Sequence, residues 1–151
     1  MQGRYFSLVL LVVVVLAGCD KPTEEALFKE AEDANRSEQY DAALEKYGQF
    51  CELYPASKKY PEALFQMGNI LYEQKSSFRE AIKSFQRILK EYPQHPIAPT
   101  AAYLIGYIAH RELKDLNAAT IAYEDFLNRF PAALQRESAR AALKELKGSG
   151  K

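Results

Sequence analysis

The residues best suited to chemistry in this 151-residue chain are two cysteines, Cys19 and Cys51, and two histidines, His95 and His110. Neither histidine has a nucleophile, base or metal ligand at a spacing that would assemble a site. The sequence also contains no HExxH motif, no paired-cysteine metal spacing and no glycine-rich phosphate loop. We therefore expect no catalytic activity, metal or cofactor, and we expect both histidines at the surface.

Cys19 is the candidate with a chemical context. The run from Leu16 to Cys19 (Leu-Ala-Gly-Cys) follows a positive residue, Arg4, and an apolar stretch of eleven residues, Phe6 to Leu16. That stretch is far short of the roughly twenty residues that span a bilayer as a helix, so residues 1–18 are predicted to be a signal peptide. The run resembles the bacterial lipobox, which implies that Cys19 is acylated and becomes the first mature residue. A free cysteine near an ordinary cleavage site is the alternative.

Acylation of Cys19 limits what the rest of the chain can do. Cys51 is then alone, so no intramolecular disulfide can form, and we interpret it as a small buried hydrophobe rather than a reactive thiol. The chain has 20 basic and 20 acidic residues, and removal of Arg4 with the leader leaves 19 basic residues. This balance argues against a nucleic-acid partner.

The composition after the predicted leader indicates an all-α fold. All five valines lie within the leader, and the rest of the chain contains ten β-branched residues against twenty alanines. Alanine favours helices and β-branched residues favour strands, so a sheet is nearly excluded.

A period of 38 positions organises this helical region. Several kinds of residue recur at that step, which is the signature of a stack of similar units. They are prolines (Pro55, Pro93, Pro131), small residues (Ala43, Ala81, Ala119), aromatics (Tyr47, Phe85, Tyr123) and two glycines (Gly68, Gly106).

Each unit is predicted to be a pair of helices. Ser77 and Glu80 form a capping-box pattern at the start of one second helix, and Asp115 is placed to cap the next. The turn within the first unit is one residue shorter. A seventh helix with an apolar stripe that includes Leu134, Ala139 and Leu146 is expected to cap the stack. The expected organisation is a tether over residues 19–23, a three-repeat domain with its cap over residues 24–147, and a disordered tail over residues 148–151.

The repeat pattern resembles the tetratricopeptide repeat. Its consensus is met by Met67-Gly68, by Ala81-x3-Phe85 and by Pro93, and it is met again at the next step of the period. The resemblance implies a solenoid of three helix pairs plus a C-terminal capping helix. Lengthened repeats behind a short acylated leader resemble the BamD-type outer-membrane-assembly lipoproteins, and also the C-terminal repeats of the Tol-Pal periplasmic coordinator.

In such solenoids the first helix of each pair lines a groove that grips a partner. Carried over position by position, the resemblance implies that nine side chains face this groove: Phe28, Glu32, Asn35, Phe65, Asn69, Tyr72, Tyr103, Tyr107 and His110. Aromatic residues anchor interfaces because they bury a large area at small entropy cost. The alternative for Phe65 and Tyr103 is that their rings only fill space between adjacent repeats.

These features predict a scaffold for protein–protein interaction, anchored through lipid on Cys19 and facing the periplasm. An accessory role in outer-membrane protein assembly is one form of this hypothesis. The alternatives are a solenoid that stacks on copies of itself through Phe28, and a Tol-Pal or cell-wall factor that binds peptide or glycan. The resemblance favours the outer membrane, whereas Asp20 after the acylated cysteine is an inner-membrane retention signal in enterobacteria.

Overall fold

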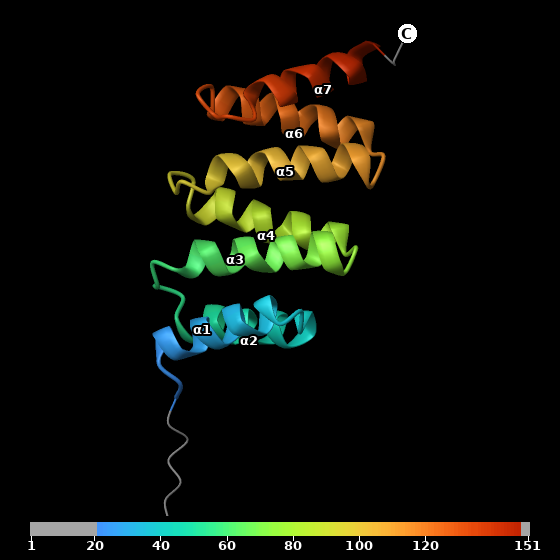
Figure 1. Cartoon of the computed structure of the whole chain (residues 1–151). Coiled ribbons are helices and arrows are strands. Elements are labelled where there is room, and N and C mark those ends of the chain that lie inside the picture. The colour runs from blue at the N-terminus through green and yellow to red at the C-terminus, as the bar shows by residue number, and fades with distance from the viewer. Residues whose placement is uncertain (1–20, 149–151) are drawn as a thin grey trace, which may run out of the picture.

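The computed structural model describes residues 21–148, which form seven α-helices and one π-helical turn (Figure 1). The predicted signal peptide, Cys19 and residues 149–151 of the predicted tail lie outside the described residues. The helices are α1 (Glu24–Arg36), α2 (Tyr40–Leu53), α3 (Tyr60–Asn69), which continues into η1 (Ile70–Gln74), α4 (Phe78–Glu91), α5 (Ala98–Arg111), α6 (Leu116–Arg129) and α7 (Arg136–Gly148). This confirms the predicted all-α fold class.

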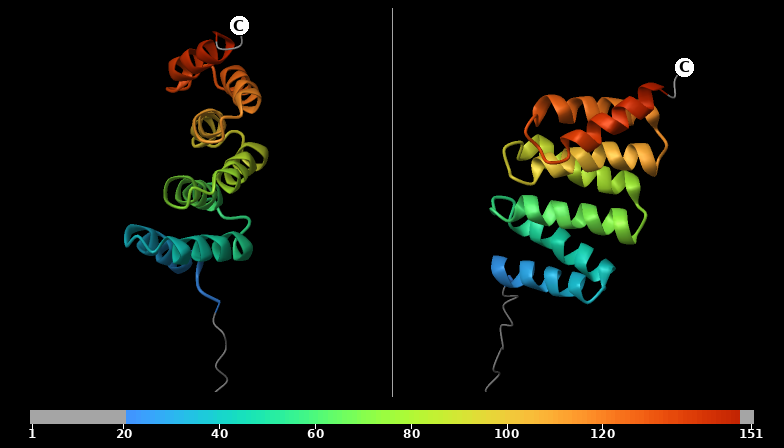
Figure 2. Two further views of the ribbon diagram at one scale, coloured as in Figure 1. Left: turned by 90° about the vertical axis from the view of Figure 1, so that its right-hand side faces the viewer. Right: turned by 45° about the horizontal axis from the view of Figure 1, so that its top comes forward.

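The helices stack in two layers. Each helix packs on the next one along the chain, in the pairs α1 with α2, α3 with α4, and α5 with α6. A side view shows α3, α5 and α7 on one side of the stack and α4 and α6 on the other (Figure 2, left). The two ends of the described chain therefore lie at opposite ends of a short solenoid (Figure 1). No helix within residues 21–148 has the length and apolar character needed to cross a membrane.

The predicted period marks the buried core of each pair. The large residues that recur every 38 positions on the second helix are almost fully buried, and so are the alanines one turn before them. They are Tyr47, Phe85 and Tyr123, Phe50, Ile88 and Phe126, and Ala43, Ala81 and Ala119. Cys51 is buried beside them, which confirms its interpretation as a core residue.

Gly68 and Gly106 leave room for one ring of the partner helix. A Cβ atom on Gly68 would lie 2.5 Å from Cε1 of Phe85, and one on Gly106 would lie 2.8 Å from Cδ1 of Tyr123. Both distances are shorter than van der Waals contact. The glycines therefore sit opposite the recurring aromatic residues of the partner helix.

The first pair has one residue fewer around its turn than the other two, as predicted. The backbone N–H of Gln39, which directly precedes α2, donates to the carbonyl five residues back, at Ala34. The equivalent N–H groups of Ser77 and Asp115 donate to carbonyls six residues back. The additional residue is absorbed by the π-helical turn η1 in the second pair and by the longer connection between α5 and α6 in the third.

One residue in each turn adopts a left-handed backbone without being glycine. Glu38, Ser76 and Lys114 have φ values of 59°, 50° and 54°, and their spacing follows the period of the repeats. Side chains at such φ values cost free energy relative to glycine. This conformation could not be predicted from the sequence, because no glycine marks it.

Of the two helix N-caps that the sequence predicts, the structure contains one. The carboxylate of Asp115 accepts the N–H of Ala118 at 2.9 Å, as predicted. Ser77 precedes α4 but makes no side-chain cap bond, and its hydroxyl donates instead to the carbonyl of Lys75 at 3.5 Å. The predicted capping box with Glu80 is therefore wrong.

Helix α7 closes the end of the stack. Ala139 and Leu146 are buried against the third pair, and Lys147 pairs with Glu124 of α6 at 2.8 Å. Leu134 was expected on this apolar stripe, but it lies before α7 and is 98% exposed. The capping stripe therefore begins later than predicted.

Candidate interaction surfaces

One equivalent ring on the first helix of each pair packs on the second helix of the same pair. Ring centroids are 5.7 Å apart for Phe28 and Tyr47, 5.6 Å for Phe65 and Phe85, and 6.0 Å for Tyr103 and Tyr123. Phe28 is only 4% exposed, so its predicted place in an open groove is wrong. Phe65 and Tyr103 are half-buried, and the second-helix rings that they contact belong to their own pair.

Phe28 is covered by its surroundings rather than by another repeat. A second ring, Phe50, lies edge-on to it at 5.1 Å, and the ammonium group of Lys59 lies 4.7 Å from its centroid. Lys59 follows the proline that ends the first unit, so its side chain returns over α1. A local sequence pattern does not show this cover.

His110 is also buried, at 6% exposure, and not at the surface as expected. Its ring lies edge-on to Tyr123 at 6.2 Å, and its Nε2 is 4.0 Å from Oε1 of Glu145 on α7. Within residues 21–148, Nδ1 has no hydrogen-bond partner. Burial, followed by the charge of Arg111, lowers the pKa of His110 against the opposing effect of Glu145. The imidazole is therefore a neutral packing group under the capping helix.

Three of the predicted residues do come together in one row of rings. Tyr72 and Tyr107 meet edge-to-face at 6.4 Å across two repeats, and Tyr107 also contacts Tyr103 at 6.2 Å. Burial raises the pKa of Tyr72 to about 12, helped by Tyr107 and Glu112. A small hollow of about 400 Å³ opens beside Tyr72, between Glu73, Ser76, Phe78 and Glu112.

The remaining predicted residues lie on the first two odd-numbered helices. Glu32 is exposed on α1, whereas Asn35 on α1 and Asn69 on α3 are half-buried. The predicted residues therefore form a partly accessible surface along the first helices of the pairs, and its aromatic side chains are concentrated at Tyr72 and Tyr107.

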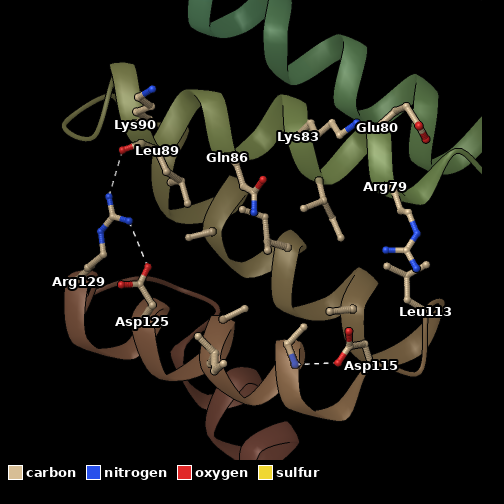
Figure 3. Close-up of a pocket in the computed structure, with 17 residues that line it drawn as sticks. Arg79, Glu80, Lys83, Gln86, Leu89, Lys90, Leu113, Asp115, Asp125 and Arg129 are labelled. Carbon is tan, nitrogen blue, oxygen red and sulfur yellow. Dashed lines mark hydrogen bonds and ion pairs between the residues drawn. The ribbon is translucent and has the colours of Figure 1, made fainter.

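A larger hollow than the one beside Tyr72 lies on the other layer, between α4 and α6, and the sequence did not predict it. We call it the α4/α6 groove; its volume is about 770 Å³ (Figure 3). The floor comes from α5 and the turn after it, and consists of Ala102, Ile105, Ala109 and Leu113. The groove is therefore apolar at its base, because the floor is the part of α5 that α4 and α6 leave uncovered.

The two walls of the α4/α6 groove differ in character. The α4 wall presents a polar stripe at the spacing of one helix face: Arg79, Lys83, Gln86 and Lys90. The α6 wall presents Ala118, Ile121 and Ala122, and Ile121 is 68% exposed. Ile121 occupies the repeat position of Lys83, and this apolar residue at a charged position was the available sequence signal.

No cluster suited to a metal is found in the part of the chain that the structure describes, where no three His, Cys, Asp or Glu side chains gather. The hollows are lined by apolar, aromatic and charged side chains.

The comparisons with known proteins agree with this picture. Residues 20–147 match the family model YfiO, which is described as an outer membrane lipoprotein. The chain belongs to this outer membrane lipoprotein family. The match covers every helix of the stack and confirms the predicted resemblance to BamD-type lipoproteins.

A solved structure supports the fold independently. The TPR domain of Arabidopsis OM64 superposes with a TM-score of 0.61 at 17% identity, over 83% of this chain and 94% of that one. At that identity the likeness concerns the solenoid fold alone. A search of the curated proteins finds no match.

In this family member the chain just after Cys19 is held against the first repeat. The Nζ of Lys21 donates to the carbonyl of Leu53 at 3.1 Å and lies 4.6 Å from the centroid of the Tyr54 ring. The hydroxyl of Tyr54 donates in turn to the carbonyl of Pro22. Cys19 itself lies outside the described residues, but only one residue separates it from the docked Lys21.

Proposed function

We propose that this protein is a lipid-anchored adaptor at the outer membrane, which faces the periplasm and recruits a protein partner through the surface of its repeats. The family is one of outer membrane lipoproteins, and the fold is a solenoid of the kind that binds along an extended surface. An accessory role in the assembly of outer-membrane proteins is the form of this proposal that the family supports best.

The observation that carries the proposal is the α4/α6 groove. Its floor is apolar, its volume of about 770 Å³ suits a segment of another protein, and Ile121 at its edge is largely exposed. An apolar hollow framed by charged side chains is typical of a binding site. The row of Tyr72, Tyr103 and Tyr107 on the opposite layer is proposed as a second contact surface, together with Glu32, Asn35, Phe65 and Asn69.

The docked segment after Cys19 bears on how the protein stands on the membrane. Because one residue separates them, the Cα atoms of Cys19 and Lys21 are at most about 7 Å apart in an extended chain. If Cys19 carries the lipid, the first repeat is held against the membrane surface. The α4/α6 groove, in the second and third repeats, then lies farther from the lipid than the first repeat.

Self-stacking receives less support than the adaptor role. The hypothesis relied on Phe28 as an apolar contact at the open end of the solenoid, but this ring is already buried within its own repeat. The outer residues of α1, such as Glu25, Lys29 and Asp33, are exposed and charged. A polar end of this kind is expected for a repeat that ends the stack.

Photo-crosslinking in cells tests the proposal. A photoreactive side chain in place of Tyr107 or Gln86 should capture an envelope protein, because the two positions sample the opposite layers of the stack. Capture should require the anchor, so replacement of Cys19 by Ala should abolish it. Capture of glycan alone at Tyr107 would support the cell-wall alternative, and capture of nothing at either position would refute the adaptor role.

A further inference from the structure

We infer that the α4/α6 groove binds an acidic amphipathic helix of a partner protein. This inference rests on the proposed adaptor function and specifies the partner by its chemistry. It is derived from the dimensions of the groove, from the backbone chemistry of its walls and from the charges along them.

The groove has the length of a short helix. The polar stripe on α4 runs from Arg79 to Lys90, which corresponds to about 16 Å at about 1.5 Å per residue, or three helical turns. One end is closed by Arg129, whose guanidinium reaches from α6 to the carbonyl of Leu89 at 3.3 Å and pairs with Asp125 at 3.1 Å (Figure 3). The other end, between Arg79 and Asp115, is not bridged by any hydrogen bond or ion pair within the described residues.

The walls and floor suit a helix better than an extended peptide. They are built from helices whose backbone N–H and C=O groups bond within the helix, so they offer no backbone partners to a strand. An extended segment on this apolar floor would bury its own amides without hydrogen bonds, which is costly. A helix satisfies its amides internally, and the alanines of the groove allow its backbone to approach closely. These alanines are Ala102, Ala109, Ala118 and Ala122.

The charges favour an acidic partner. The side chains of Arg79, Lys83 and Lys90 form no ion pair or hydrogen bond with any other residue of the range 21–148. By contrast, Arg87 on the same helix pairs with Glu91 at 2.9 Å, and Arg129 is neutralised by Asp125.

Two further acidic residues line the groove and keep their charge: Asp115 accepts the N–H of Ala118 as the cap of α6, and Glu80 is exposed beside Arg79 at the open end. Positive charge is still in excess on the α4 wall, where Arg79, Lys83 and Lys90 line the groove against Glu80 alone. The α6 wall at Ile121 is apolar, so the bound helix would turn its apolar face to α5 and α6 and its acidic flank to α4.

No segment of this chain fits that description. Residues 1–20 contain one basic and one acidic residue, Arg4 and Asp20, and so supply no acidic helix. Residue 21 is docked on the first repeat, at the end of the stack opposite α7 (Figure 1). A second copy offers no free helix either, because α1 and α7 already bury their apolar faces in the stack. The occupant is therefore a different protein.

The test uses the full-length protein in its own cells. Benzoylphenylalanine replaces Gln86, which is exposed in the middle of the α4 wall, and mass spectrometry maps the captured segment. We expect a segment with apolar residues at helical spacing over about three turns and with a net negative charge. Reversing two charges by Lys83→Glu with Lys90→Glu should reduce capture about tenfold or more, because attraction becomes repulsion.

The matched control is Lys58→Glu with Lys144→Glu, which changes the net charge equally at exposed positions outside the groove and should leave capture unchanged. An equal effect of both double variants would overturn the inference. So would capture of lipid, of glycan, of a second copy, or of a basic or extended segment. If a probe at Tyr107 captures a protein while Gln86 captures none, the adaptor role survives and the groove inference fails; if neither captures a protein, both fail.

Discussion

Replacing Gly68 by alanine tests the packing of the repeats more sharply than a large substitution, because it adds a single carbon atom. The new Cβ would lie 2.5, 2.7 and 3.0 Å from three atoms of the Phe85 ring, where ordinary contact is 3.4 Å or more. Phe85 is fully buried and its ring packs against Phe65, so any shift of the ring would displace buried neighbours. Overpacking of this kind costs about 1 to 3 kcal/mol.

Alanine is also the better helix former, by about 1 kcal/mol relative to glycine. Gly48→Ala isolates this gain, because Gly48 lies inside α2 and nothing is within 4 Å of its added Cβ. The free energy of unfolding should therefore rise by up to about 1 kcal/mol in Gly48→Ala. In Gly68→Ala it should be about 1 to 3 kcal/mol lower than in Gly48→Ala.

Urea denaturation of a protein that begins at Asp20, followed by circular dichroism, measures both variants. A third variant, Phe85→Leu, removes the ring, and in that background Gly68→Ala should lose most of its penalty. Equal stability of Gly68→Ala and Gly48→Ala would refute the close packing of ring on glycine. A penalty that persists without the ring would show that the clash lies elsewhere.

Three further predictions concern single residues. The pKa of His110 is lowered in the folded protein, so the unfolded chain takes up a proton more readily and the stability should fall as the pH drops below about 6.5. Between pH 7.5 and 5.5 the melting temperature should therefore fall less in His110→Gln than in the unchanged protein. The same dependence of melting temperature on pH in both proteins would contradict the assignment. Burial raises the pKa of Cys51 to about 11, so at pH 8 about one thiol in a thousand is ionised. Iodoacetamide should label Cys51 only after unfolding. Rapid labelling of Cys51 in the native protein would show that its thiol is accessible. Glu38 has a φ of 59°, and Glu38→Gly should stabilise the protein by up to about 1 kcal/mol in thermal unfolding, whereas a loss of stability would mean that its side chain makes a necessary contact.

The sequence predicts the repeat core well because the period encodes buried geometry. A residue such as Phe85 recurs as Tyr47 and Tyr123 at the same place in each pair, and all three are buried. The same logic predicted the shorter first turn, since one missing residue shifts the register visibly. The left-handed backbone conformation of Ser76 was not predictable, because no glycine stands at this position in the sequence.

The errors at the site arise from contacts between elements that are distant in the sequence. His110 is buried because α7 returns over it, and Phe28 is covered by Lys59 from the next connection. Neither cover follows from the helical periodicity of α5 or α1. The α4/α6 groove was missed for a related reason: it is a gap between two helices, and only apolar residues at otherwise polar repeat positions, such as Ile121 at the position of Lys83, indicate it.

The most direct test of the adaptor account is capture from Gln86 in cells that carry Ile121→Glu. This change removes the apolar edge of the α4/α6 groove and adds a negative charge, and at 68% exposure it should leave the fold intact. The control is Leu134→Glu, since Leu134 is 98% exposed and lies outside the residues that line the groove. The account predicts that capture of the partner is lost in Ile121→Glu and kept in Leu134→Glu, with equal amounts of folded, anchored protein; equal capture in both variants would contradict binding of the partner in the α4/α6 groove.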